Sequence, residues 1–378
     1  MHNLDDKYYG RFRDQTQIAL MDYLEGTEIA LEELIKTFDP NGKVKIIPSI
    51  DLGMPNNLIR LHGGFATGMA VLWKCNRPIV FIDATVNSCV SSYFELDVND
   101  AFIENFTTER IYKILQKQND TNHCFNIKSG NHFISLCKSR MTGKIYLVQH
   151  FSDSLAKDVN LGLYPTENVW YRNNMQIFNY NDRCIRYLID ASAEKFYKCA
   201  TELEKLTKED HLWLAKEIAG DHIVKYSMMP HYGMPKSNVI IIGTFLCEDY
   251  SVVPIFSKEA CPIYLFQPSK DMEFVRFEDY PFVLIPHGWG QKFIEEYSYT
   301  IKCQKKMLKI YADQKLKYQF DIESLSHLPD KIVNVRTYKN NGQDFFYLNR
   351  ENLKGKIVDI LDQKAALTRL SKGVEYYE

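Results

Sequence analysis

The stretch that decides the fold of this chain is KSGNHFISLCKSRMTGKIYLVQHFSDS, residues 128–154. Two apolar runs, HFISLCKS and KIYLVQHF, flank the tripeptide MTG, a short connection of the kind that joins antiparallel strands. His132 opens the first run and His150 closes the second. In an antiparallel pair, the start of one strand lies beside the end of the next. The pattern therefore predicts a hairpin that brings both imidazoles to one end of a sheet.

Outward from this hairpin, apolar periodicity predicts strands and helices on both sides. Short β-branched runs predict strands, in VKIIPSIDLG, GGFATGMAVLW, RPIVFIDATV, SSYFELDV, NVIIIGTFL, PIYLFQ and FVLIPHG. Helical spacing predicts helices over 14–38, 101–117, 173–206, 208–219, 292–310 and 355–367, with further strands near 331–348. No repeat or linker divides the chain. We therefore expect one α+β domain over 1–378, with two or more mixed or antiparallel sheets flanked by helices.

Composition narrows the class of protein. The chain is 45% hydrophobic and 25% charged, as is usual for a globular protein, and its polar start and lack of long apolar runs predict a cytoplasmic location. The formal net charge of −2 gives no overall attraction to nucleic acid. Positive charge gathers at Lys302, Lys305, Lys306, Lys309, Lys315 and Lys317, which form either a solvated helix face or an RNA contact.

The number and spacing of the cysteines argue against a disulfide framework. There are nine, an odd number, and no two are spaced as CxxC. Scattered single thiols of this kind are mostly small buried hydrophobes. A role for any one of them in a site therefore needs a positional reason.

Histidines at strand ends are the main candidates for chemistry. His287 closes the apolar run FVLIPHG and is followed by glycines that allow a ligand close to the backbone, and Asp83 ends PIVFID. Each histidine, taken alone, is explained by a hydrogen bond at the end of its strand. Together with His132 and His150, they favour a site. Imidazole with carboxylate and thiolate suits Mn²⁺, Zn²⁺ or Fe²⁺, and spacing does not choose among these ions.

Ordered blocks along the chain resemble the RtcB family of RNA ligases. IIPSIDLG, GGFATGMAV and RPIVFIDATVNSCVSSYFEL look like its Pro-Asp-Val-His, Gly-rich and Asp-x-x-Cys-Gly segments. KSGNHFISLC and VQHFSDS resemble its Gly-Asn-His-Phe and His-Ser-Gly-Ser segments, and YRNNMQIFNYNDRCIRYLI its Asn-Arg helix. HIVKYSMMPHYGMPKSNVIIIGTF, LIPHGWGQ and LSKGV are similar to its later His-Asn, Ser-His-Gly-Ala-Gly and Lys-Gly blocks. The order is preserved over most of the chain.

The resemblance implies a fold, two cofactors and a set of roles. It implies an RtcB-like fold, two Mn²⁺ ions and GTP, with RNA as the partner in RNA repair or tRNA splicing, and a possible activating protein. The implied metal ligands are Asp83, Cys89, His132, His150 and His222. The implied nucleotide-binding residues are Asn131 at a phosphate, Gly288 and Gly290 along the nucleotide, Lys372 at the guanine, and His287 as the guanylylated nucleophile.

The chain departs from the family pattern at several of these positions. Asp83 and Cys89 are three residues further apart than in Asp-x-x-Cys, so either the loop bulges to deliver the thiolate or the thiolate is lost. His231 competes with His222 as a ligand, and Gln291 stands where the family has arginine. Three functions therefore stay open: an RNA ligase joining 3′-phosphate or 2′,3′-cyclic phosphate ends to 5′-hydroxyl ends, a catalytically reduced homologue that binds RNA or a partner, and a metal-dependent RNA phosphodiesterase.

Overall fold

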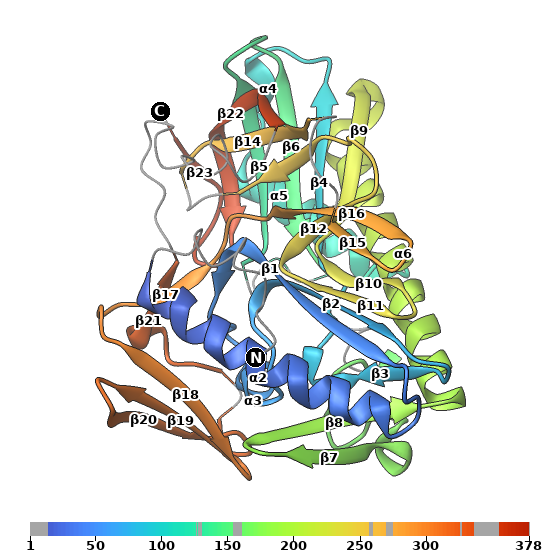
Figure 1. Ribbon diagram of the computed structural model, residues 1–378. Helices are drawn as coiled ribbons and strands as arrows, with labels where there is room; N and C mark the ends of the chain where they lie inside the picture. The colour runs from blue at the N-terminus through green and yellow to red at the C-terminus, as the bar shows by residue number, and fades with distance from the viewer. Residues whose placement is uncertain are drawn as a thin grey trace.

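A computed structural model describes residues 14–125, 127, 131–153, 161–256, 260–269, 275–325, 327–335 and 355–377. Within them the chain is mixed α and β, with mostly antiparallel strands and few long helices, in agreement with the expected α+β class (Figure 1).

The largest sheet is antiparallel and is built around the predicted hairpin. Phe133 pairs with His150 and Lys138 with Ile145, which confirms the hairpin. The sheet runs in the order β13 (Val253–Ile255), β14 (Ile263–Pro268), β22 (Gly355–Thr368), β5 (Phe133–Ser139), β6 (Ile145–Phe151), β4 (Val90–Leu96) and β9 (Ile223–Pro230), with β23 (Glu375–Tyr376) beside β22.

Smaller sheets surround it. One has the strand order β1 (Lys43–Gly53), β2 (Thr67–Lys74), β11 (Val239–Ile242) and β10 (Tyr232–Lys236), and a second has the order β12 (Thr244–Cys247), β16 (Tyr280–Pro286) and β15 (Val275–Phe277). A third has the order β3 (Ile79–Phe81), β8 (Arg183–Ile189) and β7 (Gln176–Tyr180), and a fourth the order β18 (Tyr299–Gln304), β19 (Met307–Ala312) and β20 (Lys315–Asp321). The last pairs β17 (Gln291–Phe293) with β21 (Val333–Val335).

Two long helices cover the sheets. The first, α2 (Gln15–Lys36), begins where the Asp14 carboxylate accepts a hydrogen bond from the Gln17 N–H, and buries an apolar stripe over β1. The second, α6 (Ala191–Ala219), runs along the other flank (Figure 1). The shorter helices are α3 (Leu58–His62), α4 (Ala101–Glu104) and α5 (Thr108–Lys117), with 3₁₀ turns η1 (Ile82–Ala84), η2 (Gln118–Asp120), η4 (Arg172–Asn174), η5 (Gly220–His222) and η6 (Asp330–Ile332).

Two of the predicted helices are wrong, and a third, 173–206, is confirmed only from Ala191 onward. Residues 176–189 form β7 and β8, and the helix begins only at Ala191. The segment 292–310 contains β17, β18 and the start of β19, and 355–367 forms β22. β22 is a strand because it fills the gap between β14 and β5, so its position in the sheet overrides its local helix propensity. Of the strands expected near 331–348, β21 is present, and 336–348 lie outside the described residues.

Candidate metal centre

The ends of three neighbouring strands bring a thiol and two imidazoles together. Val90, the first residue of β4, lies opposite Phe151 of β6 and Pro230 of β9. Cys89 directly precedes β4, His150 is the last residue but one of β6, and His231 directly follows β9. Sheet register therefore places these three side chains at one end of the large sheet.

The three side chains are buried, and their ligand atoms face one another. The Cys89 Sγ lies 3.7 Å from His150 Nε2, which lies 2.9 Å from His231 Nε2. All three atoms lie within 4.8 Å of one another. Metal–nitrogen bonds of about 2.1 Å and metal–sulfur bonds of about 2.3 Å put two ligands of one ion roughly 3 to 3.7 Å apart. The spacing therefore fits a single transition-metal ion.

The outer hydrogen bonds of the two imidazoles fix their orientation. His150 donates Nδ1–H to the backbone carbonyl of Asn131 at 2.9 Å, so its Nε2 keeps a lone pair. His231 Nδ1 lies 3.1 Å from the Ser91 hydroxyl. Burial, reinforced by the neighbouring histidines, holds the pKa of both imidazoles well below the usual value. They are therefore neutral at pH 7, which is the form that binds metal.

Without an ion, the same contacts close as a chain of hydrogen bonds. The Ser91 hydroxyl then donates to His231 Nδ1, and His231 donates Nε2–H to His150 Nε2. Binding an ion replaces the inner N–H by a metal bond and releases that proton to Nδ1 or to solvent. The cluster therefore adopts the hydrogen-bonded arrangement without an ion and the metal-bound arrangement with one.

The loop that delivers Cys89 is bulged and buried. Thr85 and Ser88 both adopt left-handed backbone, with φ of 47° and 49°. The Cys89 N–H donates to the Asn87 side chain at 3.1 Å, and the buried Arg60 guanidinium donates to the carbonyls of residues 84 and 85 at 3.1 and 2.8 Å. Left-handed backbone in residues other than glycine costs free energy that these bonds offset. The longer spacing after Asp83 is thus absorbed by a loop that still presents the thiol.

Asp83 itself does not join the cluster. Its carboxylate forms an ion pair with Arg186 and accepts the Arg186 backbone N–H at 3.3 Å. The side chain is 1% exposed, so the arginine provides the compensation that a buried carboxylate requires. The geometry therefore does not support the predicted role of Asp83 as a ligand beside Cys89, because its carboxylate is paired with the partly buried Arg186 of β8.

The structure places His231, and not the predicted ligand His222, in the cluster. His222 is exposed in η5 and precedes β9, whose first residue pairs with Leu96 at the far end of β4. Its ring packs edge-on against Phe102. A strand of this length separates its ends by about 20 Å. His222 and Cys89 therefore cannot hold one ion, and the alternative ligand, His231, occupies the position instead.

His132 completes the group of buried histidines. Its Nε2 lies 3.9 Å from Cys89 Sγ, and its ring centre is 6.0 Å from that of His150. The thiol thus faces imidazoles on two sides. His132 is therefore close to the thiol but falls outside the tighter group of Cys89, His150 and His231.

His287 lies against this cluster and is held by Asp51. Its ring stacks on that of His231, with centres 5.2 Å apart and planes 21° apart. His287 Nδ1 lies 3.0 Å from an Asp51 carboxylate oxygen that also accepts the Gly288 N–H at 2.9 Å. Although burial would raise the pKa of Asp51, bonds from His287 and Gly288 bring it below the usual value. The ionised Asp51 holds the proton on Nδ1, which leaves Nε2 as a nucleophile.

Gly288, one of the two glycines predicted to line a nucleotide, has a packing role. Gly288 has φ of +100°, and a Cβ there would lie 1.8 Å from the Phe256 carbonyl oxygen. The Gly290 carbonyl carbon would lie 3.0 Å from a Cβ on Gly53. Between them, Trp289 projects into a neighbouring pocket. Gly288 therefore allows the backbone to turn and the tryptophan to line that pocket, and the absence of a side chain at Gly53 allows the Gly290 backbone to pass close by.

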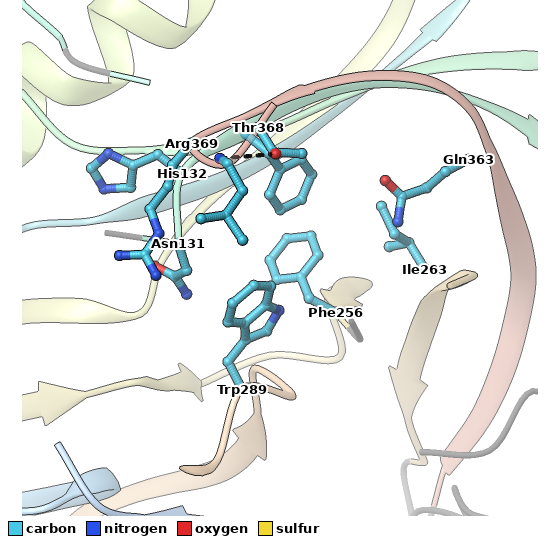
Figure 2. Close-up of a pocket in the computed structure, with 10 residues that line it drawn as sticks. Asn131, His132, Phe256, Ile263, Trp289, Gln363, Thr368 and Arg369 are labelled. Carbon is cyan, nitrogen blue, oxygen red and sulfur yellow. Dashed lines mark hydrogen bonds between the residues drawn. The ribbon is translucent and has the colours of Figure 1, made fainter. Parts of the chain in front are cut away.

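This pocket opens beside His132 and joins polar groups to aromatic rings (Figure 2). Asn131, His132 and Arg369 lie together on one side, and Phe256 and Trp289 lie across from them. The remaining lining residues are Phe133, Ile263, Gln363, Thr368 and Leu370. Among the described residues, Trp289 Nε1 is buried with no hydrogen-bond acceptor. The pocket thus offers a cation, an amide and aromatic rings to a ligand with a flat apolar part.

Lys372 lies outside the pocket lining. It is exposed, and its carbonyl accepts a hydrogen bond from Tyr112 at 3.1 Å. Arg369, on the same C-terminal segment, lines the pocket instead. Sequence reasoning missed Arg369 and Asp51. The sequence signals for Asp51 were its place in a mostly apolar run and its alignment with the histidine of the Pro-Asp-Val-His block.

The sequence matches no protein-family model and no curated protein. In the described part of the chain, no helix combines the length and the apolar character needed to cross a membrane.

Proposed function

We propose that the protein is a metal-dependent nucleotidyl transferase that works through His287 and joins RNA ends as RtcB ligases do. The observation that supports this most is the position of His287. Its Nδ1 is fixed by Asp51, and its ring stacks on His231, a member of the Cys89–His150–His231 cluster. A nucleophile oriented by a carboxylate next to a metal site is the arrangement that phosphoryl transfer to histidine requires.

In the proposed reaction, His287 Nε2 attacks the α-phosphorus of GTP, and pyrophosphate leaves. A phosphorus–nitrogen bond forms as a phosphorus–oxygen bond breaks. The RNA 3′-phosphate then takes GMP from the histidine, and a 5′-hydroxyl displaces GMP to form the phosphodiester. A bound Mn²⁺ ion would neutralise charge on the phosphate oxygens. Asp51 would stabilise the positive charge that develops on the ring when Nε2 bonds to phosphorus, and the ring becomes neutral again when GMP leaves.

The pocket beside His132 supports a nucleotide as the ligand. Asn131 and Arg369 can donate to phosphate or ribose oxygens, and Trp289 and Phe256 can contact a purine ring. Arg369 is an exposed cation on this lining, and we assign to it the role of the arginine that RtcB ligases have where this chain has Gln291.

The test is covalent labelling of the full chain. Purified protein is incubated with Mn²⁺ and α-labelled GTP, and label that survives denaturation but is released by acid is counted. We expect labelling of the wild type, none of His287→Ala, and wild-type labelling of His222→Ala, an exposed histidine at the far end of β9. An unlabelled wild type that nevertheless contains metal contradicts the ligase proposal, as does equal labelling of His287→Ala.

A second candidate function is metal binding without ligation. The ion pair between Asp83 and Arg186 favours it, because it leaves Cys89 and His132 without the carboxylate expected for a second ion. A protein that binds one equivalent of metal per chain and takes no label from GTP supports this candidate. RNA cleavage without GTP would instead indicate a phosphodiesterase.

A further inference from the structure

The sheet formed by β18, β19 and β20 has one buried and one solvent-facing side (Figure 1). Alternate residues of β18 and β19 pack into the core with α2, among them Ile301, Leu308 and Ile310. The residues between them face outward. The lysine-rich segment that sequence reasoning placed partly on a helix therefore forms an exposed β-surface.

Two lysines lie directly opposite each other on this outer side. Lys302 pairs in register with Lys309, which pairs in turn with Gln319. In the next row Thr300 pairs with Tyr311, and Lys302 Nζ lies 5.5 Å from the centre of the Tyr311 ring. Like charges directly opposite one another destabilise an antiparallel pair. Lys309 Nζ donates to the Gln304 side chain at 2.8 Å, so the two ammonium groups turn toward opposite ends of the strands and spread positive charge along the sheet.

The excess of positive charge extends beyond this pair. Residues 299–321 contain six lysines and two aspartates. Lys306 pairs with Glu323, and Lys317 pairs with Glu295. Within the described ranges, the four other lysines form no ion pair with an acidic side chain: Lys302, Lys305, Lys309 and Lys315. The surface is therefore complementary to an extended anion rather than to a single small one.

We propose that this outer face, made of Thr300, Lys302, Lys309, Tyr311 and Gln319, binds single-stranded RNA. Phosphates lie over Lys302 and Lys309, and a base stacks on the half-buried Tyr311 ring. A positive surface with an aromatic platform is what single-strand binding requires. The surface is separate from the site of His287, and only the choice of RNA over DNA rests on the proposed function.

The experiment measures binding of a fluorescent, unstructured 20-nucleotide RNA to the full chain by anisotropy at several salt concentrations. Lys302→Ala/Lys309→Ala should weaken binding about tenfold and lower the salt slope by about 1.4, the value for two contacts to single-stranded phosphates. The matched control, Lys198→Ala/Lys216→Ala, removes two exposed lysines from α6 and should bind as the wild type does.

Tyr311→Leu separates RNA from a simple polyanion. It should weaken RNA binding several-fold and leave heparin binding unchanged, because only a base stacks. Equal losses for the two lysine pairs, no loss for the β18–β19 pair, or no RNA binding by the wild type would each overturn the proposal. His287→Ala should bind RNA normally. A chain that binds RNA here but is not labelled by GTP would refute the proposed function and leave this surface intact.

Discussion

Asp51 is the residue on which the nucleophile depends, since its carboxylate accepts from both His287 Nδ1 and the Gly288 backbone. Asp51→Asn keeps the shape, and its amide oxygen can still accept from both N–H groups, but the substitution removes the negative charge that would stabilise the ring when Nε2 bonds to phosphorus. We expect labelling by GTP to fall by about 10³-fold or more, as for other carboxylates hydrogen-bonded to a catalytic histidine. Metal content should stay at the wild-type level. Unchanged labelling would show that Asp51 has only a packing role.

A second prediction at this scale concerns the choice between two histidines. His231→Ala removes a ligand atom that lies 2.9 Å from His150 Nε2, whereas His222→Ala removes an exposed ring. Loss of one of three protein ligands should reduce bound metal to a small fraction of the wild-type amount, and His222→Ala should retain it all. Metal analysis after gel filtration measures both. Equal retention by the two variants would mean that the cluster is a hydrogen-bonded chain without an ion.

Residue by residue, the strand-end pattern predicted His132, His150 and His287 near one another, and the family resemblance added Cys89. It could not choose His231 over His222, since the two flank the same strand and the choice depends on which end of β9 meets β4. The Asp83 ion pair was hidden for a similar reason. Its partner comes from β8, a strand that the sequence reading placed inside a helix.

At the scale of elements, the two wrong helices in the C-terminal third have different causes. Residues 299–304 alternate strictly between buried and exposed, and this two-residue period was present in the sequence YTIKCQ. β22, by contrast, contains LDQKAALT, whose residues favour helix in isolation. Pairing with β14 and β5 determines its conformation, and such long-range pairing leaves little trace in local sequence.

The turn from β16 to β17 supplies a prediction about an element. Gly288 has a left-handed φ, and a methyl group added there would clash with the Phe256 carbonyl oxygen. Gly143, in the turn between β5 and β6, has φ of +70° with nothing within 4 Å. Gly143→Ala should therefore lower the free energy of unfolding by about 1 kcal/mol, and Gly288→Ala by at least about 3 kcal/mol. Urea unfolding followed by circular dichroism compares them, and equal midpoints would contradict this reading of the turn.

For the whole molecule, two neighbouring side chains of α6 make stability depend on pH in opposite directions. Burial, together with repulsion from Asp153, raises the pKa of Asp210 to about 8. Burial lowers the pKa of His211 to about 3. Asp210 faces His123, whose Nδ1 lies 2.8 Å away, while His211 contacts Ser92 and the Phe151 carbonyl.

The signs follow from linkage between proton binding and folding. Asp210 takes up a proton on folding, so its contribution to stability is complete below about 3.8 and is lost as the pH rises to about 8. His211 stays neutral in the folded chain, so stability falls as the pH drops from 6.5 toward 3.

Between pH 6.5 and 8, Asp210 acts without opposition from His211. We therefore expect the free energy of unfolding of the metal-free chain to decrease over this interval, by no more than about 1.4 kcal/mol per pH unit. Asp210→Asn should flatten this slope, whereas His211→Asn should leave it nearly unchanged and reduce only the part of the loss below pH 6.5 that His211 contributes beside the buried His150 and His231. Urea unfolding in the presence of a chelator measures both, and a slope that survives in Asp210→Asn would show that another group takes up the proton.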